Sequence, residues 1–214
     1  MCRSYEQKTS LRELSRQFRH LQPGMPELPR REEVFARDPV LILTGAGERI
    51  IPRSAHWGLV GSFLDRPPRE PLINLRSEGL ATTPFYSRIL KHQRCLIPAS
   101  AFFEWPGRPY NNGHKLRISH DKGKPLMFAG IFDIHPSAGT TCAILTVPAD
   151  GVVAPNNDRM PLMLDSVTSA FWLQEHAEFP EDDYVALTGL PAPRLKTESI
   201  APPEISPQLA FEFA

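Results

Sequence analysis

The chain has 214 residues, of which 41% are hydrophobic and 22% charged, so it can bury one sizeable core but is short for several domains. Its 24 basic residues balance 24 acidic ones, which excludes a global positive field as the cause of binding to nucleic acid or to an anionic membrane. No apolar run approaches the ~20 residues that span a bilayer, and the N-terminus lacks a secretory signal, so we expect a cytoplasmic protein without membrane contact.

The predicted elements begin with a helix after Ser10, because Ser10 and Glu13 have the spacing of a capping box and apolar residues follow at helical intervals up to residue 21. A buried strand is expected over residues 40–44, and Thr83-Pro84 is typical of the start of a second helix. Further strands are expected over residues 94–97, 101–105, 125–132 and 141–147, and a short helix over residues 166–174.

This order of elements places a strand-rich middle between helices. It predicts an α+β fold: a single domain with a mostly antiparallel, barrel-like β-sheet core flanked by short helices. We expect the domain to cover residues 1–179. Residues 180–214 form a proline-rich C-terminal tail, packed on the domain or fraying from it. Three cysteines without metal-ligand spacing predict neither a disulfide framework nor a metal site, and Cys95 and Cys142 are expected as core thiols.

Cys2 is the most informative residue for chemistry, because a cysteine after the initiator methionine permits removal of that methionine. The mature chain would then begin with a thiol near pKa ~8.5 beside an α-amine near ~7.7–8.0, both partly nucleophilic at neutral pH. With an aldehyde, such an aminothiol forms a Schiff base and then a thiazolidine ring. The alternative is that Cys2 is only the second residue of the chain.

Three further segments carry polar side chains where packing alone does not require them. In the first, Asn74 and Arg76 alternate on one side of an extended stretch that is otherwise a solvated strand edge. In the second, Glu104 lies within an apolar and aromatic strand, where burial would raise its pKa toward neutrality unless an arginine pairs with it. In the third, Asn157 precedes Arg159-Met160-Pro161, which is otherwise a turn that starts a strand.

With these segments in view, the chain resembles the SOS-response-associated peptidase (SRAP) family from residue 1 to about residue 173. The motifs that carry the resemblance occur in the family's order: Cys2, Trp57-Gly58-Leu59-Val60, Asn74-Leu75-Arg76-Ser77-Glu78, the stretch from Arg94 to Trp105, Phe128 to Phe132, and Asp158-Arg159-Met160-Pro161. Six ordered motifs are far more specific than any one of them.

The resemblance implies a protein that shields abasic sites in single-stranded DNA by capturing the open sugar aldehyde as a thiazolidine on Cys2, with slow lyase or reversal activity and without a cofactor. We also expect a monomer, which would associate with the nucleoid in a bacterial host. In the catalytic roles, Cys2 is the nucleophile, Asn74 orients it, Glu104 moves protons and Asn157 contacts the sugar. The residues expected to bind DNA, with Trp57 offering an aromatic face and the arginines holding phosphates, are Trp57, Arg76, Arg88, Arg94 and Arg159.

Two departures from the family's pattern affect the expected chemistry. The family has a glycine between its cysteine and the following arginine, whereas this chain reads Cys2-Arg3. The family also has a histidine two residues before the Arg-Met-Pro arginine, where this chain has Asn157. Because an amide cannot exchange a proton near pH 7, we expect capture to survive and proton-dependent reversal to slow. His56 is a second candidate for the missing proton carrier.

Two other functions compete with covalent capture. A thiol peptidase, acting on other chains or only in removing Met1, would use Cys2 on an acyl carbon, but Asn157 deprives it of its natural base. A noncatalytic single-stranded DNA-binding module would keep the groove and lose the chemistry.

Overall fold

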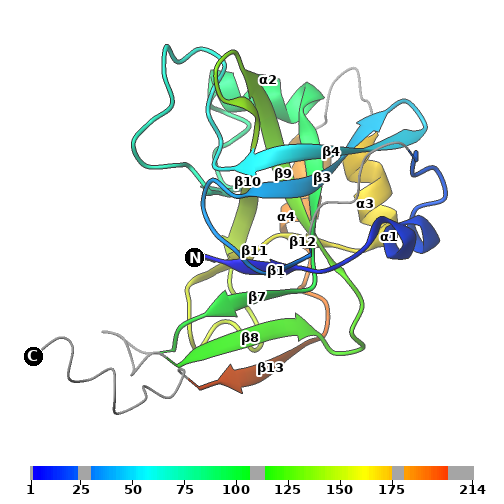
Figure 1. The fold of residues 1–214 in the computed structure, drawn as a ribbon, viewed down its shortest axis with the longest axis vertical. Helices are drawn as coiled ribbons and strands as arrows, with labels where there is room; N and C mark the ends of the chain where they lie inside the picture. Colours follow the sequence, from blue (N-terminus) through cyan, green and yellow to red (C-terminus); the bar gives the residue numbers. More distant parts are fainter. Residues whose placement is uncertain (1, 24–29, 107–113, 175–180, 202–214) are drawn as a thin grey trace, which may run out of the picture.

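Two sheets organise the part of the chain that the computed structural model describes, which is residues 2–23, 30–106, 114–174 and 181–201 (Figure 1). The strands are β1 (Tyr5–Gln7), β2 (Arg31–Val34), β3 (Pro39–Ala46), β4 (Arg49–Trp57), β5 (Asn74–Arg76), β6 (Arg94–Ala99), β7 (Ala101–Glu104), β8 (Lys115–His120), β9 (Leu126–His135), β10 (Gly139–Pro148), β11 (Arg159–Pro161), β12 (Met163–Leu164) and β13 (Leu195–Ile200). The helices are α1 (Leu11–Gln17), α2 (Pro84–His92), α3 (Ser166–Leu173) and α4 (Glu181–Thr188).

The larger sheet closes on itself. Its strands pair in the order β10-β4-β3-β6-β9, and β9 pairs back with β10. Among the pairings of the described strands, β10 runs parallel to β4 and to β5, and the others are antiparallel. This arrangement confirms the predicted α+β fold with a mostly antiparallel, barrel-like core.

The smaller sheet has the order β13-β8-β7-β1-β2 and lies beside the closed ring, in the lower part of Figure 1. The side chain of Gln7, which is buried, joins the two sheets: its amide donates to the carbonyls of Leu41 and Pro98 and accepts from the Leu41 amide. Because all three contacts go to backbone groups of the barrel, they fix the position of β1 against it.

The helices α1, α2 and α3 begin where the local sequence predicts. Ser10 and Glu13 form the expected capping box of α1. The second helix follows Thr83, with Pro84 in its first turn, and Asp165 caps α3 by accepting from the amides of Val167 and Thr168. The side chains of Ser10 and Asp165 pair amide groups that the first turn of a helix cannot pair internally, whereas Thr83 makes no side-chain capping hydrogen bond.

The C-terminal segment contributes elements that local sequence did not indicate. Residues 181–188 form α4, and β13 pairs with β8 over its whole length, from Leu195 opposite His120 to Ile200 opposite Lys115. Of the predicted tail, residues 195–200 therefore belong to the smaller sheet and residues 181–188 to a helix. Residues 202–214 of that tail lie outside the described residues.

Candidate active site

The register of β1 against β7 brings the N-terminus to Glu104. Tyr5 lies opposite Phe102, and the amide of Phe103 donates to the carbonyl of Ser4 at 3.1 Å. The two strands are antiparallel, so residues before Tyr5 lie beside the end of β7, where Glu104 is placed. This one strand pairing thus brings Cys2 close to Glu104, although the two residues are about a hundred positions apart in the sequence.

Cys2 is fully buried at this end of β1. Its thiol donates to the Ser4 carbonyl at 3.2 Å, and its own carbonyl accepts from Asn74 Nδ2 at 2.7 Å. Burial, with a smaller contribution from the nearby Glu104 carboxylate, raises the pKa of the Cys2 thiol well above its ordinary value. The sulfur is therefore a neutral thiol at physiological pH.

Glu104 and Asn157 form the other half of the cluster. Glu104 is 4% exposed, and its Oε2 accepts a hydrogen bond from Asn157 Nδ2 at 2.8 Å. Burial raises the pKa of Glu104, and the hydrogen bond from Asn157 opposes this shift. A carboxyl group whose pKa is moved toward neutrality can both give and accept a proton.

Two acceptors in this cluster are buried and unused. Asn74 Oδ1 and Glu104 Oε1 have no hydrogen-bond partner within the described residues. A buried polar atom without a partner costs about 1–3 kcal/mol and is rare in folded proteins. Both atoms therefore remain able to accept a hydrogen bond from a donor group such as an amine or a hydroxyl.

The arginines expected at the DNA differ in their surroundings. Arg76, two residues after Asn74 on β5, is exposed. Arg159 is buried, and its Nη1 and Nη2 donate to the two carboxylate oxygens of Glu78 at 2.6 and 2.7 Å. Nη2 also donates to the Thr146 carbonyl. Arg76 is thus accessible to a phosphate, whereas Arg159 is paired with Glu78. Sequence reasoning missed Glu78 as a partner, although it lies in the same motif as Asn74.

Trp57 has no open face for a base, which differs from the expected stacking role. It is 0% exposed, its indole Nε1 donates to the Ile73 carbonyl at 2.9 Å, and its ring meets Tyr5 edge-on at 5.0 Å between centroids. The large aromatic surface is used inside the barrel because burying it is strongly favourable. Through Ile73 it holds the backbone immediately before Asn74.

Arg94 also differs from its expected role at a phosphate. It is buried, and its guanidinium donates to the carbonyls of Trp172 at 2.7 Å, Lys91 at 2.8 Å, and Leu90 and Gln174. These carbonyls end α2 and α3, and burial lowers the pKa of Arg94 to about 10. The positive charge of Arg94 therefore interacts with the carbonyl groups at the C-terminal ends of α2 and α3.

Arg88, on α2, is exposed with its guanidinium 5.8 Å from the centre of the Phe85 ring. Phe85 in turn meets Phe63 edge-on at 4.6 Å, and Phe63 is 66% exposed. This aromatic pair beside a cation, in which Phe63 is exposed and Phe85 is half-buried, was missed by sequence reasoning. His56 is exposed, with its Nδ1 3.0 Å from the Arg37 carbonyl, and no contact recorded for it within the described chain reaches Cys2 or Glu104.

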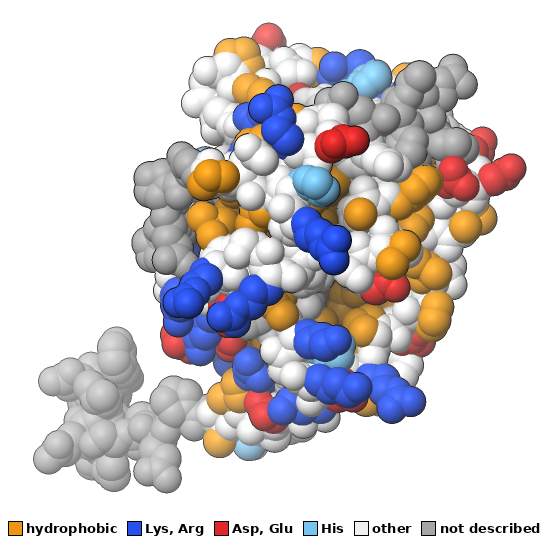
Figure 2. All heavy atoms as spheres, turned by 90° about the vertical axis from the view of Figure 1, so that its right-hand side faces the viewer, with side chains coloured by type: hydrophobic (Ala, Val, Ile, Leu, Met, Phe, Trp, Pro, Cys, Tyr) orange, Lys and Arg blue, Asp and Glu red, His pale blue; other side chains and the backbone are white. Residues whose placement is uncertain are grey.

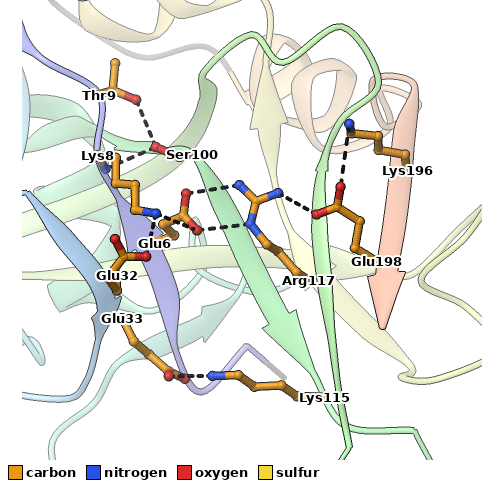
Figure 3. A network of polar contacts seen from close by, with 10 residues as sticks. All are labelled: Glu6, Lys8, Thr9, Glu32, Glu33, Ser100, Lys115, Arg117, Lys196 and Glu198. Atoms are coloured by element: carbon orange, nitrogen blue, oxygen red, sulfur yellow. Dashed lines mark hydrogen bonds and ion pairs between the residues drawn. The ribbon is translucent and has the colours of Figure 1, made fainter. Parts of the chain in front are cut away.

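Figure 3 shows the polar network that holds β1 on both sides. Glu6, whose side chain is nearly buried, accepts from Arg117 Nε and Nη2 of β8, each at 3.0 Å, and Arg117 also reaches Glu198 of β13. Ser4, whose side chain is not drawn there, donates to Glu33 of β2 at 2.6 Å. Paired charges with this geometry define the register of β1, and so they define where Cys2 lies.

The structure gives no sign of a metal centre in the residues it describes, where no three His, Cys, Asp or Glu side chains are grouped as ligands. Within the same residues, no helix has the length and apolar character needed to cross a membrane. The thiols of Cys95 and Cys142 are buried, as predicted, and burial raises both pKa values.

The raised pKa of Glu104 predicts a pH-dependent cost to stability. The folded chain keeps the Glu104 proton to a higher pH than the unfolded chain, so the free energy of unfolding falls as pH rises from the ordinary glutamate pKa, about 4.3, toward the folded value. Glu104→Gln removes this titration and keeps an acceptor for Asn157. We expect it to raise stability at pH 7 by about 1 kcal/mol and to leave stability near pH 4 unchanged in thermal unfolding.

Glu78→Gln is the matched control, because the hydrogen bonds from Arg159 lower the pKa of Glu78. Its effect has the opposite sign: this variant should lose stability at pH 7 and approach the wild type as the pH falls below the ordinary glutamate pKa. A Glu104→Gln variant that is less stable than the wild type at pH 7 would contradict the assigned cost of burying this carboxylate.

Comparison with solved structures supports the fold. A protein from Bacteroides thetaiotaomicron superposes with a TM-score of 0.79 at 17% identity, covering 93% of this chain and 92% of the other. A protein from Bordetella bronchiseptica gives a TM-score of 0.75 at 21% identity, covering 94% and 100%. At these identities the likeness is one of architecture.

Comparison with curated sequences finds relatives along much of the chain. The abasic site processing protein YobE of Bacillus subtilis is 29% identical over 63% of this chain, and the abasic site processing protein YedK of Escherichia coli is 27% identical over 78% of it and 75% of its own length. The match spans 63% of the length of YobE, so the chain corresponds to about three fifths of that relative. The family model described as SOS response associated peptidase matches residues 1–202, and the chain therefore belongs to the SRAP family.

Proposed function

We propose that this protein captures abasic sites in single-stranded DNA covalently, through a thiazolidine formed by Cys2 after Met1 is removed. One observation carries the proposal: Cys2, Asn74 and Glu104 meet in a buried cluster in which Asn74 Oδ1 and Glu104 Oε1 have no partner among the described residues. An α-amine on Cys2 and the hydroxyls of an opened sugar are donors of the kind these two acceptors need.

The chemistry is balanced without a cofactor. The α-amine of Cys2 adds to the sugar aldehyde, and loss of one water leaves an imine. The thiol sulfur then adds to the imine carbon while its proton is transferred, finally to the nitrogen, which closes the five-membered ring. No electron acceptor is required, and the only product besides the adduct is water.

The protonation states of Cys2 and Glu104 suit this order of steps. The Cys2 thiol is neutral because burial raises its pKa, so the amine is the first nucleophile and the sulfur reacts only once the imine is beside it. The raised pKa of Glu104 allows this side chain to accept the thiol proton during closure and to return it to nitrogen. Asn74, which donates to the Cys2 carbonyl, holds the residue in place.

The substrate class is supported by the relatives. YobE and YedK are both named abasic site processing proteins, and an abasic site in equilibrium with its open form presents an aldehyde. Of the cations near the cluster, Arg76 is exposed on the strand that carries Asn74, where it would meet a phosphate next to the lesion. Arg159 would join it if the strand displaced Glu78, and Arg88 would extend the contact along α2.

Salt dependence tests the phosphate contacts. Arg76→Gln removes one expected contact, so the slope of log K against log salt for undamaged single-stranded DNA should decrease by about 0.7. Arg88→Gln should have the same effect if the strand reaches α2. Arg12→Gln is the matched control, because Arg12 is exposed on α1, which follows β1 at the end away from the N-terminus (Figure 1). Equal slopes for Arg76→Gln and Arg12→Gln would remove Arg76 from the binding surface.

The experiment that tests the function mixes untagged protein with an oligonucleotide containing one abasic site and analyses the product by denaturing gel and intact mass. The expected mass is that of the chain without Met1 plus the DNA minus one water, with the adduct mapped to Cys2. An oligonucleotide with a tetrahydrofuran site, which lacks the aldehyde, is the matched control and should give no adduct.

The same experiment distinguishes the competing functions. Cleavage of peptides without an adduct would indicate the thiol peptidase, and salt-sensitive binding without an adduct would indicate a noncatalytic module. Retention of Met1 in protein that nevertheless forms the adduct would overturn the thiazolidine, because the amine would then be blocked.

A further inference from the structure

The ion pair between Glu78 and Arg159 connects the two strands that flank β10. Thr146 of β10 lies opposite Arg76 of β5 on one side and opposite Pro161 of β11 on the other. Glu78 follows β5 by two residues, and Arg159 begins β11. The guanidinium donates through Nη1 and Nη2 to the two carboxylate oxygens, at 2.6 and 2.7 Å. A guanidinium binds a phosphate through the same pair of parallel hydrogen bonds.

The two partners of this pair differ in exposure. The side chain of Arg159 is 7% exposed, whereas that of Glu78 is 55% exposed. Hydrogen bonds from Arg159 lower the pKa of Glu78, so the carboxylate is charged at neutral pH. Because a buried guanidinium without a counter-charge is costly, Glu78 can turn into solvent only if another anion takes its place at Arg159.

Arg159 has a donor that the pair does not use, and it lies next to the candidate active site. Its Nε is buried and has no hydrogen-bond partner among the described residues. Its backbone amide donates to Asn157 Oδ1 at 3.4 Å, and Asn157 Nδ2 donates to Glu104. A phosphate has more acceptor oxygens than a carboxylate, so it is the kind of anion that could use Nε as well.

We propose that Glu78 occupies the place of a DNA phosphate in the free protein, and that a phosphate of the single strand replaces it at Arg159 when DNA binds. This inference rests on the proposed function, which supplies single-stranded DNA as the partner of the site. Glu78 is then an internal competitor. It keeps the buried guanidinium paired in the free protein, and it lowers the affinity for DNA by the cost of breaking the pair.

Cations elsewhere on the molecule are an alternative surface for DNA. Figure 2 shows Lys and Arg side chains spread over the face that carries α1, and α1 follows β1 at the end away from the N-terminus (Figure 1). Binding of DNA to that face would not depend on Glu78 or Arg159. The affinity of a variant at Glu78 therefore distinguishes the two surfaces.

The test measures binding of an undamaged single-stranded oligonucleotide by fluorescence anisotropy. Glu78→Gln should raise the affinity about threefold to tenfold, because a neutral amide competes less well for Arg159. The same variant is expected to lose stability at pH 7, so a general structural defect would not produce tighter binding. Glu48→Gln is the matched control. It removes the same charge from an exposed turn between β3 and β4, at the opposite end of β4 from Trp57, and should bind like the wild type.

A second background separates competition from simple repulsion between Glu78 and DNA. Arg159→Gln should weaken binding, and adding Glu78→Gln to it should change the affinity much less than in the wild type, because no guanidinium is left to compete for. Equal gains in the two backgrounds would overturn the proposal. An unchanged or lower affinity of the single variant Glu78→Gln would overturn it as well, and this result decides by itself if Arg159→Gln does not fold.

This experiment is independent of covalent capture, because the undamaged oligonucleotide has no aldehyde. If Glu78→Gln binds more tightly but the wild type forms no adduct with abasic DNA, the result contradicts only the proposed function. If the wild type forms the adduct and Glu78→Gln gains no affinity, only the competition by Glu78 is overturned.

Discussion

Cys2→Ala is expected to abolish the heat-stable complex with abasic DNA entirely, because ring closure needs the sulfur that this change removes. Alanine also permits removal of Met1, so the variant keeps an α-amine at the same place. It should still form an imine, which sodium borohydride would trap as a stable band. Denaturing gels with and without borohydride thus separate the contribution of the amine from that of the thiol.

Cys2→Ser is the conservative companion to this variant. Its hydroxyl fills a similar volume, but it is a weaker nucleophile, so the borohydride-independent band should be lost here too. Thermal unfolding and binding to undamaged single-stranded DNA serve as controls of folding for both variants. A heat-stable band from Cys2→Ala without reductant would show that another nucleophile makes the bond, and the thiazolidine mechanism would have to be abandoned.

Asn157→His is expected to accelerate reversal of the adduct. Asn157 donates to Glu104 Oε2 at 2.8 Å, so a side chain at this position is in direct contact with the proposed proton carrier. The amide cannot take up or release a proton near neutrality, whereas an imidazole with a pKa near 6.5 can. A positioned acid–base group contributes about 10²- to 10⁴-fold to a rate, and we expect reversal to accelerate within this range.

The measurement is the release of labelled DNA from purified adduct in the presence of excess unlabelled abasic DNA, as a function of pH. In the histidine variant the rate should change as the imidazole titrates, near pH 6–7. Asn156→His is the matched control, because Asn156 is adjacent in sequence but bonds to the Val152 carbonyl. An unchanged reversal rate in Asn157→His would refute the assigned consequence of having an amide at this position.

Much of the fold could be predicted because its signals are local. The capping box of Ser10 and Glu13, the Thr83-Pro84 helix start and the apolar runs of β3, β6, β9 and β10 depend on neighbours in sequence, and each appears where expected. Short strands such as β1 and β13 were not predicted. They have few residues and gain their stability from partner strands far along the chain, which no local pattern reveals.

The candidate site, too, could be predicted only in part. The side-chain types of Cys2, Asn74 and Glu104 indicated a reaction, and the motifs that contain them occur in the same order as in the family. Sequence did not reveal that Trp57 and Arg94 are buried, because whether an indole or a guanidinium faces solvent depends on what packs against it. Glu78, the partner of Arg159, was missed for the same reason.

The sequence by itself determined which nucleophile, carboxyl group and amides this protein possesses. It also determined which segments form helices or long strands, because local hydrogen bonding needs no contact with distant residues. Only the tertiary structure decided that β1 lies against β7, and this pairing places the thiol beside Glu104 and removes both from water. Proximity and desolvation set their pKa values, and these are properties of the packed chain that no single segment carries.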